Sequence, residues 1–263
     1  LKVIAVVGTG TDNIDITEAT NHGIAVGNTP GVTSKSTADM AIGLLLAAAR
    51  RIVESDKWLR EGNWKHDLAP VGFLGSEVHG STLGIIGLGK IGREMAKRAK
   101  SFDMNIVYFS RTRKKPDELD LGLEWTSNID ELLSQSDFVS IHVPFTQETR
   151  HLISKHNLFK MKQSAILVNT SRGPVVDQTA LYHALKEGTI AGAALDVMEV
   201  EPIDLRDPLI ALNNVVLVPH LGTATHKTRL IMATMAAENL FAGLKQQRLP
   251  HIVNPEVYST WGL

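Results

Sequence analysis

The chain has 263 residues, of which 43% are hydrophobic and 21% charged, which is enough for one large or two modest globular domains. A formal net charge of −1 gives no overall field that favours nucleic acid, and the absence of cysteine excludes disulfides, thiolate metal sites and cysteine nucleophiles. The longest apolar run, residues 40–49, is about half of the roughly 20 residues that a membrane helix needs.

Short strands and a helix are predicted in the first part of the chain. Residues 3–7 and 24–26 are β-branched and apolar, and between them Asp15 is typical of a helix N-cap and Gly23 of a helix stop. The chain has no initiator Met and starts inside the first predicted strand, so we expect further residues upstream. The lack of cysteine suits a reducing compartment, and we predict a cytoplasmic location.

A long helix is predicted after the turn at Pro30 and Gly31. Its apolar positions nearly encircle it, which indicates burial by both domains or by a partner subunit. Residues 62–80 are rich in glycine and are predicted to form a surface connection.

The rest of the chain alternates apolar strands with helices. This alternation is typical of parallel βαβ units, and the continuous apolar strands indicate a sheet covered on both faces. We therefore predict an α/β fold with a doubly wound parallel sheet, closed by a helix over residues 225–246. The predicted strands are residues 82–87, 105–110, 137–143, 165–170, 191–197 and 214–219.

A glycine-rich loop follows the first of these strands. Gly87, Gly89 and Gly92 form a G-x-G-x-x-G pattern between an apolar strand and an amphipathic helix. In that context Gly87 suits a tight turn, Gly89 suits close approach of a pyrophosphate, and Gly92 suits close packing of helix on strand. The pattern predicts dinucleotide binding at the N-terminus of the helix.

A basic turn stands where an NAD site would have an acidic residue. The strand at 105–110 ends in Ser110, Arg111, Thr112 and Arg113, at the distance from the glycine loop where Asp or Glu would bind the ribose 2′-hydroxyl. Guanidinium groups suit a 2′-phosphate instead. The turn therefore favours NADP(H) over NAD(H).

Ionisable residues follow three further strands. Arg172 follows one, Asp196, Glu199 and Glu201 follow the next, and His220 follows the last. Ligands of open α/β sheets bind at these carboxyl ends. A cation that binds a carboxylate, a histidine that donates a proton and a carboxylate that keeps the histidine charged are what reduction of a 2-oxo acid requires. Spacing alone leaves Glu199 and Glu201 as alternatives for the last role.

Other polar residues are assigned structural roles. Asp177 is predicted to cap the helix that follows it. The remaining nine histidines, including His142, are predicted to be structural or solvated, and no spacing of His, Asp and Glu indicates a metal site.

Taken together, these motifs resemble the D-isomer-specific 2-hydroxyacid dehydrogenase family along essentially the whole chain. The matching segments are "GTGTDNID", "NTPGVTSKSTADMAIGLLLAAARR", "GSTLGIIGLGKIGREMAKRAKSF", "MKQSAILVNTSRGPVVDQTALYHALKEGTIAGAALDV", "EVEP" and "NVVLVPHLGTATHKTR", in the order of the family. "VPHLGTATHKTR" and the "SRTR" turn are most similar to the glyoxylate/hydroxypyruvate reductases, a branch that commonly uses NADPH.

The resemblance implies roles for individual residues. Arg172, Glu201 and His220 match the catalytic residues, so the resemblance selects Glu201 over Glu199. Thr9 and Gly10 match the turn that binds the substrate carboxylate, together with Arg172 and His220. Asp196 matches the residue that meets the nicotinamide carboxamide. The cofactor contacts implied are Thr37, Gly87, Gly89, Lys90, Ile91, Gly92, Ser110, Arg111, Thr112, Arg113, Pro144, Thr149, Thr170, Ser171, Asp196 and Gly222.

The resemblance also implies an architecture and partners. A Rossmann domain at residues 33–228 is expected within a smaller flavodoxin-like substrate domain, of which residues 1–32 and 229–263 are present and the N-terminal part is missing. The active site of the family lies in the cleft between the domains. The chain is expected to form a homodimer through residues 34–80, and neither nucleic acid nor a membrane is expected as a partner.

The expected reaction is the NADPH-dependent reduction of glyoxylate to glycolate and of hydroxypyruvate to D-glycerate, with NADH as a weaker cofactor. Two alternatives stay open. One is a sugar-acid reductase of the 2-ketogluconate type. The other is a non-catalytic dinucleotide-sensing protein similar to the C-terminal-binding-protein corepressors, which share the catalytic residues but favour an acidic residue at the position of Arg111.

Overall fold

The computed structural model describes residues 1–65 and 71–263, and residues 66–70 of the predicted connection lie outside this description. The described residues form two compact units. The larger comprises residues 37–222, and the smaller combines residues 1–36 with residues 223–263.

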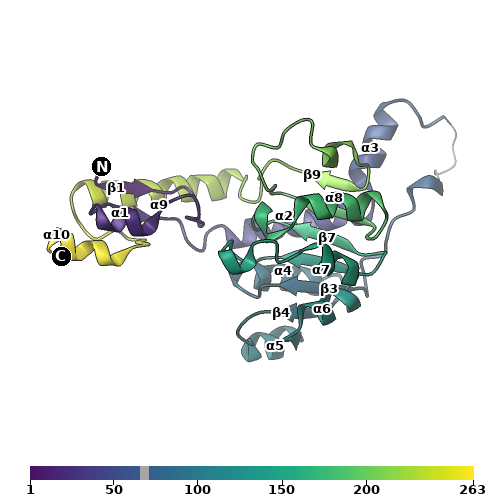
Figure 1. Ribbon diagram of the computed structural model, residues 1–263, viewed down its shortest axis with the longest axis horizontal. Coiled ribbons are helices and arrows are strands. Elements are labelled where there is room, and N and C mark those ends of the chain that lie inside the picture. The colour runs from purple at the N-terminus through teal and green to yellow at the C-terminus, as the bar shows by residue number, and fades with distance from the viewer. Residues whose placement is uncertain (66–70) are drawn as a thin grey trace. The chain divides into compact units, whose positions relative to one another are not determined.

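The larger unit is built on one parallel sheet of seven strands (Figure 1). Its order is β5-β4-β3-β6-β7-β8-β9, so the chain extends the sheet to one side of β3 and then returns to extend it on the other. The first six strands have the order of a Rossmann fold, which confirms the predicted class. The strands are β3 (Thr82–Ile86), β4 (Asn105–Phe109), β5 (Glu124–Thr126), β6 (Phe138–Ile141), β7 (Ile166–Asn169), β8 (Gly192–Leu195) and β9 (Val215–Leu217).

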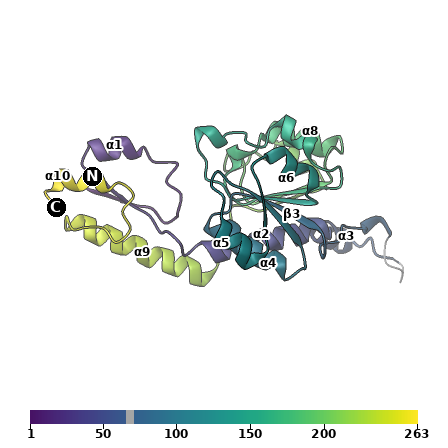
Figure 2. The same ribbon diagram turned by 90° about the horizontal axis from the view of Figure 1, so that it is seen from below.

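Helices cover both faces of this sheet (Figure 2). On one face, side chains of α6, α7 and α8 pack with Ile86, Ile141 and Leu167 of the strands. On the other face, α2 and α4 pack with Ile85 and Val168. Neighbouring residues of a strand point to opposite faces, and both sets are buried, which explains the continuous apolar strands. The helices are α2 (Ser34–Ala49), α3 (Ile52–Arg60), α4 (Lys90–Lys100), α5 (Lys115–Leu121), α6 (Ile129–Gln135), α7 (Lys155–Lys160) and α8 (Gln178–Lys186), with 3₁₀ turns η1 (Val71–Phe73), η2 (Gln147–Thr149), η3 (Gly173–Val175) and η4 (Pro208–Ala211).

The prediction of one long helix after Pro30 is wrong, because the helix breaks between α2 and α3. Arg51 has a left-handed backbone with φ of 51°, which a helix does not continue through. The carbonyl oxygen of Ala49 accepts a hydrogen bond from Ser76 N at 2.8 Å, which takes the place of a partner from the helix. The side chain of Arg51 binds both oxygens of Glu54 at 2.8 Å and so closes the first turn of α3.

The smaller unit has a parallel pair of strands, β1 (Val3–Ala5) and β2 (Ala25–Gly27), with α1 (Ile16–Asn21), α9 (His226–Leu244), η5 (Pro255–Val257) and α10 (Tyr258–Trp261). The caps confirm two predictions: Asp15 accepts a bond from Glu18 N, and α9 begins after Thr225, whose side chain accepts from Thr228 N. The core of the unit consists of Val3, Ala25, Leu249, Val257 and Tyr258. Within the described residues, every helix of either unit is too short or too polar to cross a membrane.

Candidate active site

All seven strands of the larger sheet end in one row of paired residues. Register pairs join each strand end to the next across the sheet, so the residues that follow the row leave the sheet at one edge. This is the edge at which α/β sheets bind ligands. The row consists of Thr126, Phe109, Ile86, Ile141, Asn169, Leu195 and Leu217.

The glycine loop begins directly after Ile86. Gly87 has φ of +97°, and a Cβ there would lie 2.8 Å from the carbonyl oxygen of His142. A Cβ on Gly92 would lie 2.1 Å from the Gly87 carbonyl oxygen, so this glycine lets α4 approach the turn. A Cβ on Gly89, by contrast, would meet no atom within 4 Å. The open space lies at Gly89, where a pyrophosphate would reach the first amides of α4, at Lys90 and Ile91.

The basic turn is held by residues of α5 and β5. Arg113 binds both oxygens of Glu118 and lies over the ring of Trp125, with 5.2 Å between the guanidinium carbon and the ring centroid. Tyr108 donates to Glu118 at 2.6 Å and accepts from Lys114 N at 2.7 Å. Burial first, and then Glu118, raise the pKa of Tyr108 to about 12, so the hydroxyl stays a donor.

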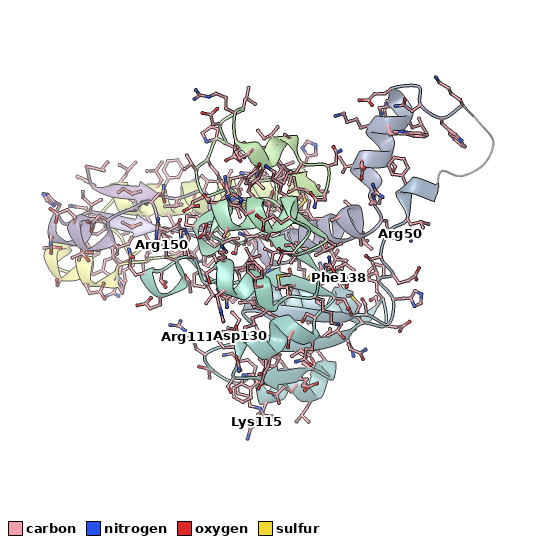
Figure 3. All side chains as sticks on the ribbon, turned by 45° about the vertical axis from the view of Figure 1, so that its right-hand side comes forward. Arg50, Arg111, Lys115, Asp130, Phe138 and Arg150 are labelled. Atoms are coloured by element: carbon pink, nitrogen blue, oxygen red, sulfur yellow. The ribbon has the colours of Figure 1, made fainter. Side chains whose placement is uncertain are left out.

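Arg111, Ser110 and Thr112 occupy the tip of this turn. The Ser110 hydroxyl donates to the carbonyl of Thr112 at 2.7 Å, which folds the tip on itself. The side chain of Arg111 is exposed and extends away from the ribbon (Figure 3). Arg113 is therefore engaged with Glu118, while Arg111 projects into solvent.

Arg172 follows the end of β7 through a turn that Asn169 organises. The buried Asn169 amide donates to the carbonyl of Arg172 at 3.0 Å, and its oxygen accepts from the amide and the hydroxyl of Ser171. A Cβ on Gly173 would lie 1.7 Å from the carbonyl oxygen of Met198, so the backbone after Arg172 packs directly on the loop after β8. Asn169 was not among the predicted site residues, and the one signal for it in the sequence is an amide at the end of the strand predicted over residues 165–170.

Asp196 is the first residue beyond β8 and is 1% exposed. Its carboxylate accepts hydrogen bonds from the amides of Leu221 and Gly222, the latter at 2.8 Å. Burial raises the pKa of Asp196 above its ordinary value, and these two amides oppose the rise. A Cβ on Gly222 would lie 3.4 Å from Thr37, so the structure brings together three of the predicted cofactor residues.

His220 and Glu201 form a pair beyond β9 and β8. His220 Nδ1 lies 2.8 Å from Glu201 Oε2, and Glu201 Oε1 accepts from Met198 N at 3.0 Å. His220 has φ of 53°, a strained conformation for a residue that is not glycine, and its amide donates to the carbonyl of Asp196. Of the two carboxylates that spacing left open, Glu201 lies against His220, and Glu199 lies against His151 at 2.8 Å.

The other predicted residues divide between the two units. Pro144 and Thr149 follow β6, where the Thr149 hydroxyl donates to the Pro144 carbonyl at 2.8 Å, and Thr170 lies between Asn169 and Ser171. Thr9 belongs to the smaller unit, and its hydroxyl lies 3.2 Å from the carbonyl oxygen of Thr29. Gly10 follows it in the same unit. Asp177 caps α8 as predicted, accepting from Ala180 N.

The residues of the edge fit a dinucleotide. Thr170 Oγ1 and His142 Nδ1 are buried at neighbouring strand ends without a hydrogen-bond partner among the described residues, and the space at Gly89 is open. Within residues 1–65 and 71–263, no group of three His, Asp or Glu is arranged to hold a metal ion. A cavity of about 260 Å³ lies elsewhere, between α7 and α8, and contains none of the predicted residues.

Comparison with known proteins decides the family. Residues 42–222 match the model of the D-isomer specific 2-hydroxyacid dehydrogenase NAD-binding domain. The chain belongs to the D-isomer-specific 2-hydroxyacid dehydrogenase family. It is therefore an oxidoreductase that uses a nicotinamide dinucleotide and acts on 2-hydroxy acids, which confirms the resemblance seen in the sequence.

Several members of the family are close to this chain. A glyoxylate reductase of Korarchaeum cryptofilum is 54% identical over 98% of this chain and 77% of its own length. A glyoxylate reductase of Thermococcus litoralis is 53% identical over 99% of this chain and 79% of its own length. The crystal structure of an NADPH-dependent glyoxylate/hydroxypyruvate reductase of Sinorhizobium meliloti, in complex with NADP and malonate, matches with a TM-score of 0.88 at 34% identity, over 98% of this chain and 78% of that one.

Proposed function

We propose that this dehydrogenase reduces glyoxylate to glycolate and hydroxypyruvate to D-glycerate, with NADPH as the electron donor. Relatives that are more than half identical along nearly the whole chain are glyoxylate reductases, and a structural neighbour is an NADPH-dependent glyoxylate/hydroxypyruvate reductase. The observation that carries the proposal is the pair of His220 and Glu201 at 2.8 Å, on the sheet edge that Arg172 also leaves.

The proposed reaction assigns one task to each of these residues. NADPH, when bound, supplies a hydride to the carbonyl carbon of the substrate. Arg172 binds the substrate carboxylate and polarises the ketone. His220 gives its proton to the carbonyl oxygen as the negative charge develops there. Glu201 stabilises the protonated imidazole through Nδ1, which leaves Nε2 as the donor that faces the substrate.

The preference for NADPH rests on the basic turn. Arg111 is an exposed cation at the end of β4, four residues before Lys115 begins α5, and no acidic residue stands between. A guanidinium at this position suits a ribose 2′-phosphate, and it cannot accept a bond from a 2′-hydroxyl.

The smaller unit is proposed to be part of the substrate domain. Thr9 and Gly10 stay the predicted contacts of the substrate carboxylate there. The turn that holds them is rigid, because Thr29 N donates to the Gly8 carbonyl and Asn28 donates to the Thr9 carbonyl at 2.8 Å.

The test is a spectrophotometric assay of the wild-type protein with glyoxylate or hydroxypyruvate, in which oxidation of NADPH and of NADH is compared. We expect His220→Gln to lower kcat by about 10²- to 10⁴-fold, the usual contribution of a general acid. Arg172→Ala is expected to lower kcat/KM by about 10²- to 10³-fold, as for loss of a charged substrate contact. His156→Gln, an exposed histidine of α7 that pairs with Asp130, is the matched control and should match the wild type.

Other outcomes would contradict the proposal in distinct ways. Turnover of sugar acids but not of glyoxylate would mean that the substrate is a sugar acid. Tight NADPH binding with no turnover of any 2-oxo acid would indicate a dinucleotide-sensing protein. Faster turnover with NADH would overturn the role of the basic turn.

A further inference from the structure

A second histidine–carboxylate pair lies beside His220 and Glu201. Glu199 Oε1 is 2.8 Å from His151 Nε2 and 3.9 Å from Arg150 Nη2. Glu199 Oε2 accepts from the amide of Gln178 at 3.4 Å, and the Gln178 side-chain oxygen accepts from the amide of Glu199 at 2.9 Å. His151, Gln178 and Glu199 are called the Glu199 cluster below. The proposed mechanism uses none of them.

The Glu199 cluster joins three segments that are distant in sequence. Gln178 is the first residue of α8, and its amide nitrogen Nε2 also donates to Asp207 at 2.7 Å. His151 follows η2, and Glu199 lies in the loop after β8. Since the Glu199 backbone and side chain both bond to Gln178, the loop after β8 is attached to α8 at two points.

One of these segments carries Glu201, and the segment of His151 bonds to the turn that follows Arg172. Glu201 stands two residues beyond Glu199, and its carboxylate binds Met198 N on the other side of Glu199. The His151 amide donates to the carbonyl of Pro174 at 2.8 Å, in the 3₁₀ turn that starts directly after Arg172. The cluster therefore connects the loop of Glu201 with the turn of Arg172.

The backbone of His151 is itself constrained. It has φ of 50°, which costs a non-glycine residue about 1 kcal/mol or more and persists only where the surroundings enforce it. The surroundings here are the bond to Pro174 and the hydrogen bond between His151 and Glu199, whose side chains are 35% and 25% exposed respectively. The conformation directs the imidazole toward the loop that holds Glu201.

We propose that Glu199 is a positioning residue, which through His151 and Gln178 fixes the loop that holds Glu201 against His220. The inference rests on the proposed function, in which Glu201 supports the proton donor. Without the Glu199 side chain the loop keeps its link at Met198 and the bond from the Glu199 amide to Gln178, but it loses the bond from the Gln178 amide and the contact with His151. The Glu201 carboxylate is then no longer held within 2.8 Å of His220 Nδ1.

The test compares Glu199→Ala, Glu199→Gln and Gln178→Ala with the wild-type chain in the presence of NADPH. Glu199→Ala is expected to lower kcat for glyoxylate on the order of 10- to 100-fold, as for a small displacement of a reacting group, with the KM for NADPH unchanged. The solvent isotope effect on kcat should rise, because proton donation becomes slower. Glu199→Gln retains an acceptor for His151 and should therefore have a higher kcat than Glu199→Ala. The kcat of Gln178→Ala should lie between those of Glu199→Ala and the wild type.

A matched control is available in the same unit. Glu187 lies at the end of α8, with its carboxylate 3.8 Å from His183, so Glu187→Ala removes a histidine–glutamate pair away from the sheet edge. This variant should keep the kcat of the wild type. A Glu199→Ala variant with wild-type kcat, or one that loses kcat and NADPH affinity in parallel with a lower Tm, would reduce the cluster to a structural role and overturn the inference.

A second measurement does not depend on turnover. In the ¹⁵N-labelled protein with NADPH, the Nδ1 signal of His220, identified by its absence in His220→Gln, reports the hydrogen bond to Glu201. A change of this signal in Glu199→Ala, and none in Glu187→Ala, supports the positioning role even if glyoxylate is not the substrate. An unchanged signal contradicts the inference, whatever the wild-type activity. A wild-type chain that turns over neither 2-oxo acid contradicts only the proposed function.

Discussion

Arg111 and Arg113 are two residues apart in the same basic turn, yet their surroundings differ. Arg113 binds Glu118 and lies over Trp125, whereas Arg111 extends from the ribbon (Figure 3). We predict that Arg111→Ala raises the KM for NADPH by about 10- to 100-fold, the value of one or two charged hydrogen bonds, and leaves the KM for NADH unchanged. Steady-state titration of both cofactors measures this.

Arg113→Ala is expected to act differently, since it frees Glu118 and loosens the turn. It should raise the KM for NADPH less than Arg111→Ala does, and it should also lower the Tm. If Arg111→Ala and Arg113→Ala raise the KM for NADPH equally and neither lowers the Tm, then Arg113 leaves Glu118 when the cofactor binds.

His142 gives the fold a dependence on pH. It lies one residue beyond β6, with Nε2 2.9 Å from Ser140 Oγ, and burial lowers its pKa from 6.5 to about 4. Between these pH values His142 is protonated in the unfolded chain but neutral in the folded chain. The free energy of unfolding therefore falls by up to about 3 kcal/mol as the pH drops from 6.5 to 4. His142→Gln should lose less stability over this range. Urea denaturation at pH 7 and pH 4.5 measures it, and parallel losses in both proteins would exclude this histidine as the cause.

At the scale of elements, two glycines at the junction of β3 and α4 have different roles, one in folding and the other in cofactor binding. A Cβ on Gly92 would lie 2.1 Å from a backbone oxygen, while one on Gly89 would meet open space. Gly92→Ala is therefore predicted to lower the Tm of the cofactor-free protein, because α4 has to move off the turn. Gly89→Ala should keep the Tm within a few degrees but weaken NADPH binding, since the methyl group occupies the space of the pyrophosphate.

Thermal unfolding and fluorescence titration of NADPH distinguish these effects. Each variant is the control for the other. A Gly89→Ala protein that binds NADPH like the wild type would place the pyrophosphate away from this glycine.

The sequence predicts most elements because their signals are local. Asp15 and Asp177 cap helices as expected, and six of the seven strands of the larger sheet are apolar runs between turn residues. The edge strand β5 was missed, because the three residues Glu124–Thr126 show no apolar run. The break at Arg51 was missed as well, since a left-handed arginine and a bond from Ser76 to Ala49 have no local signature.

The candidate site is less predictable than the fold, since pairing across the sheet edge is a tertiary property. Spacing alone does not distinguish Glu199 from Glu201, whereas the fold does, because Glu199 lies against His151 and Glu201 against His220. The predicted roles of Arg111 and Arg113 are the same, because the ion pair of Arg113 with Glu118 in α5 is not visible in the turn itself. Asn169 was missed because its contacts with Ser171 and Arg172 depend on the shape of one turn.

At the scale of the whole molecule, the larger unit has an exposed apolar surface around α3. Ile52, Val53, Leu59, Trp64 and Leu74 are each about half exposed or more. Apolar surface of this kind marks an interface, so we predict a homodimer that buries it. Val53→Glu together with Leu59→Glu should raise the dimer dissociation constant by at least about 100-fold, from the loss of about 3 kcal/mol of burial.

Sedimentation velocity over a range of concentrations measures the association. Leu119→Glu on α5 is the control, because Leu119 is 88% exposed but belongs to another surface. A wild-type chain that sediments as a monomer at every concentration would contradict the dimer.

The single row in which all seven strands end has a consequence for how the sequence can change over time. Arg172, Glu201 and His220 all follow strands that end in this row, and side chains of the loops beyond Phe109, Ile141 and Leu195 anchor those loops. We therefore expect insertions in the loops on the opposite edge of the sheet to be tolerated. Deletion of one residue inside β7 or β8 would reverse the faces of the strand and displace Arg172 or Glu201 at once. Such deletions should be absent from any functional descendant of this chain.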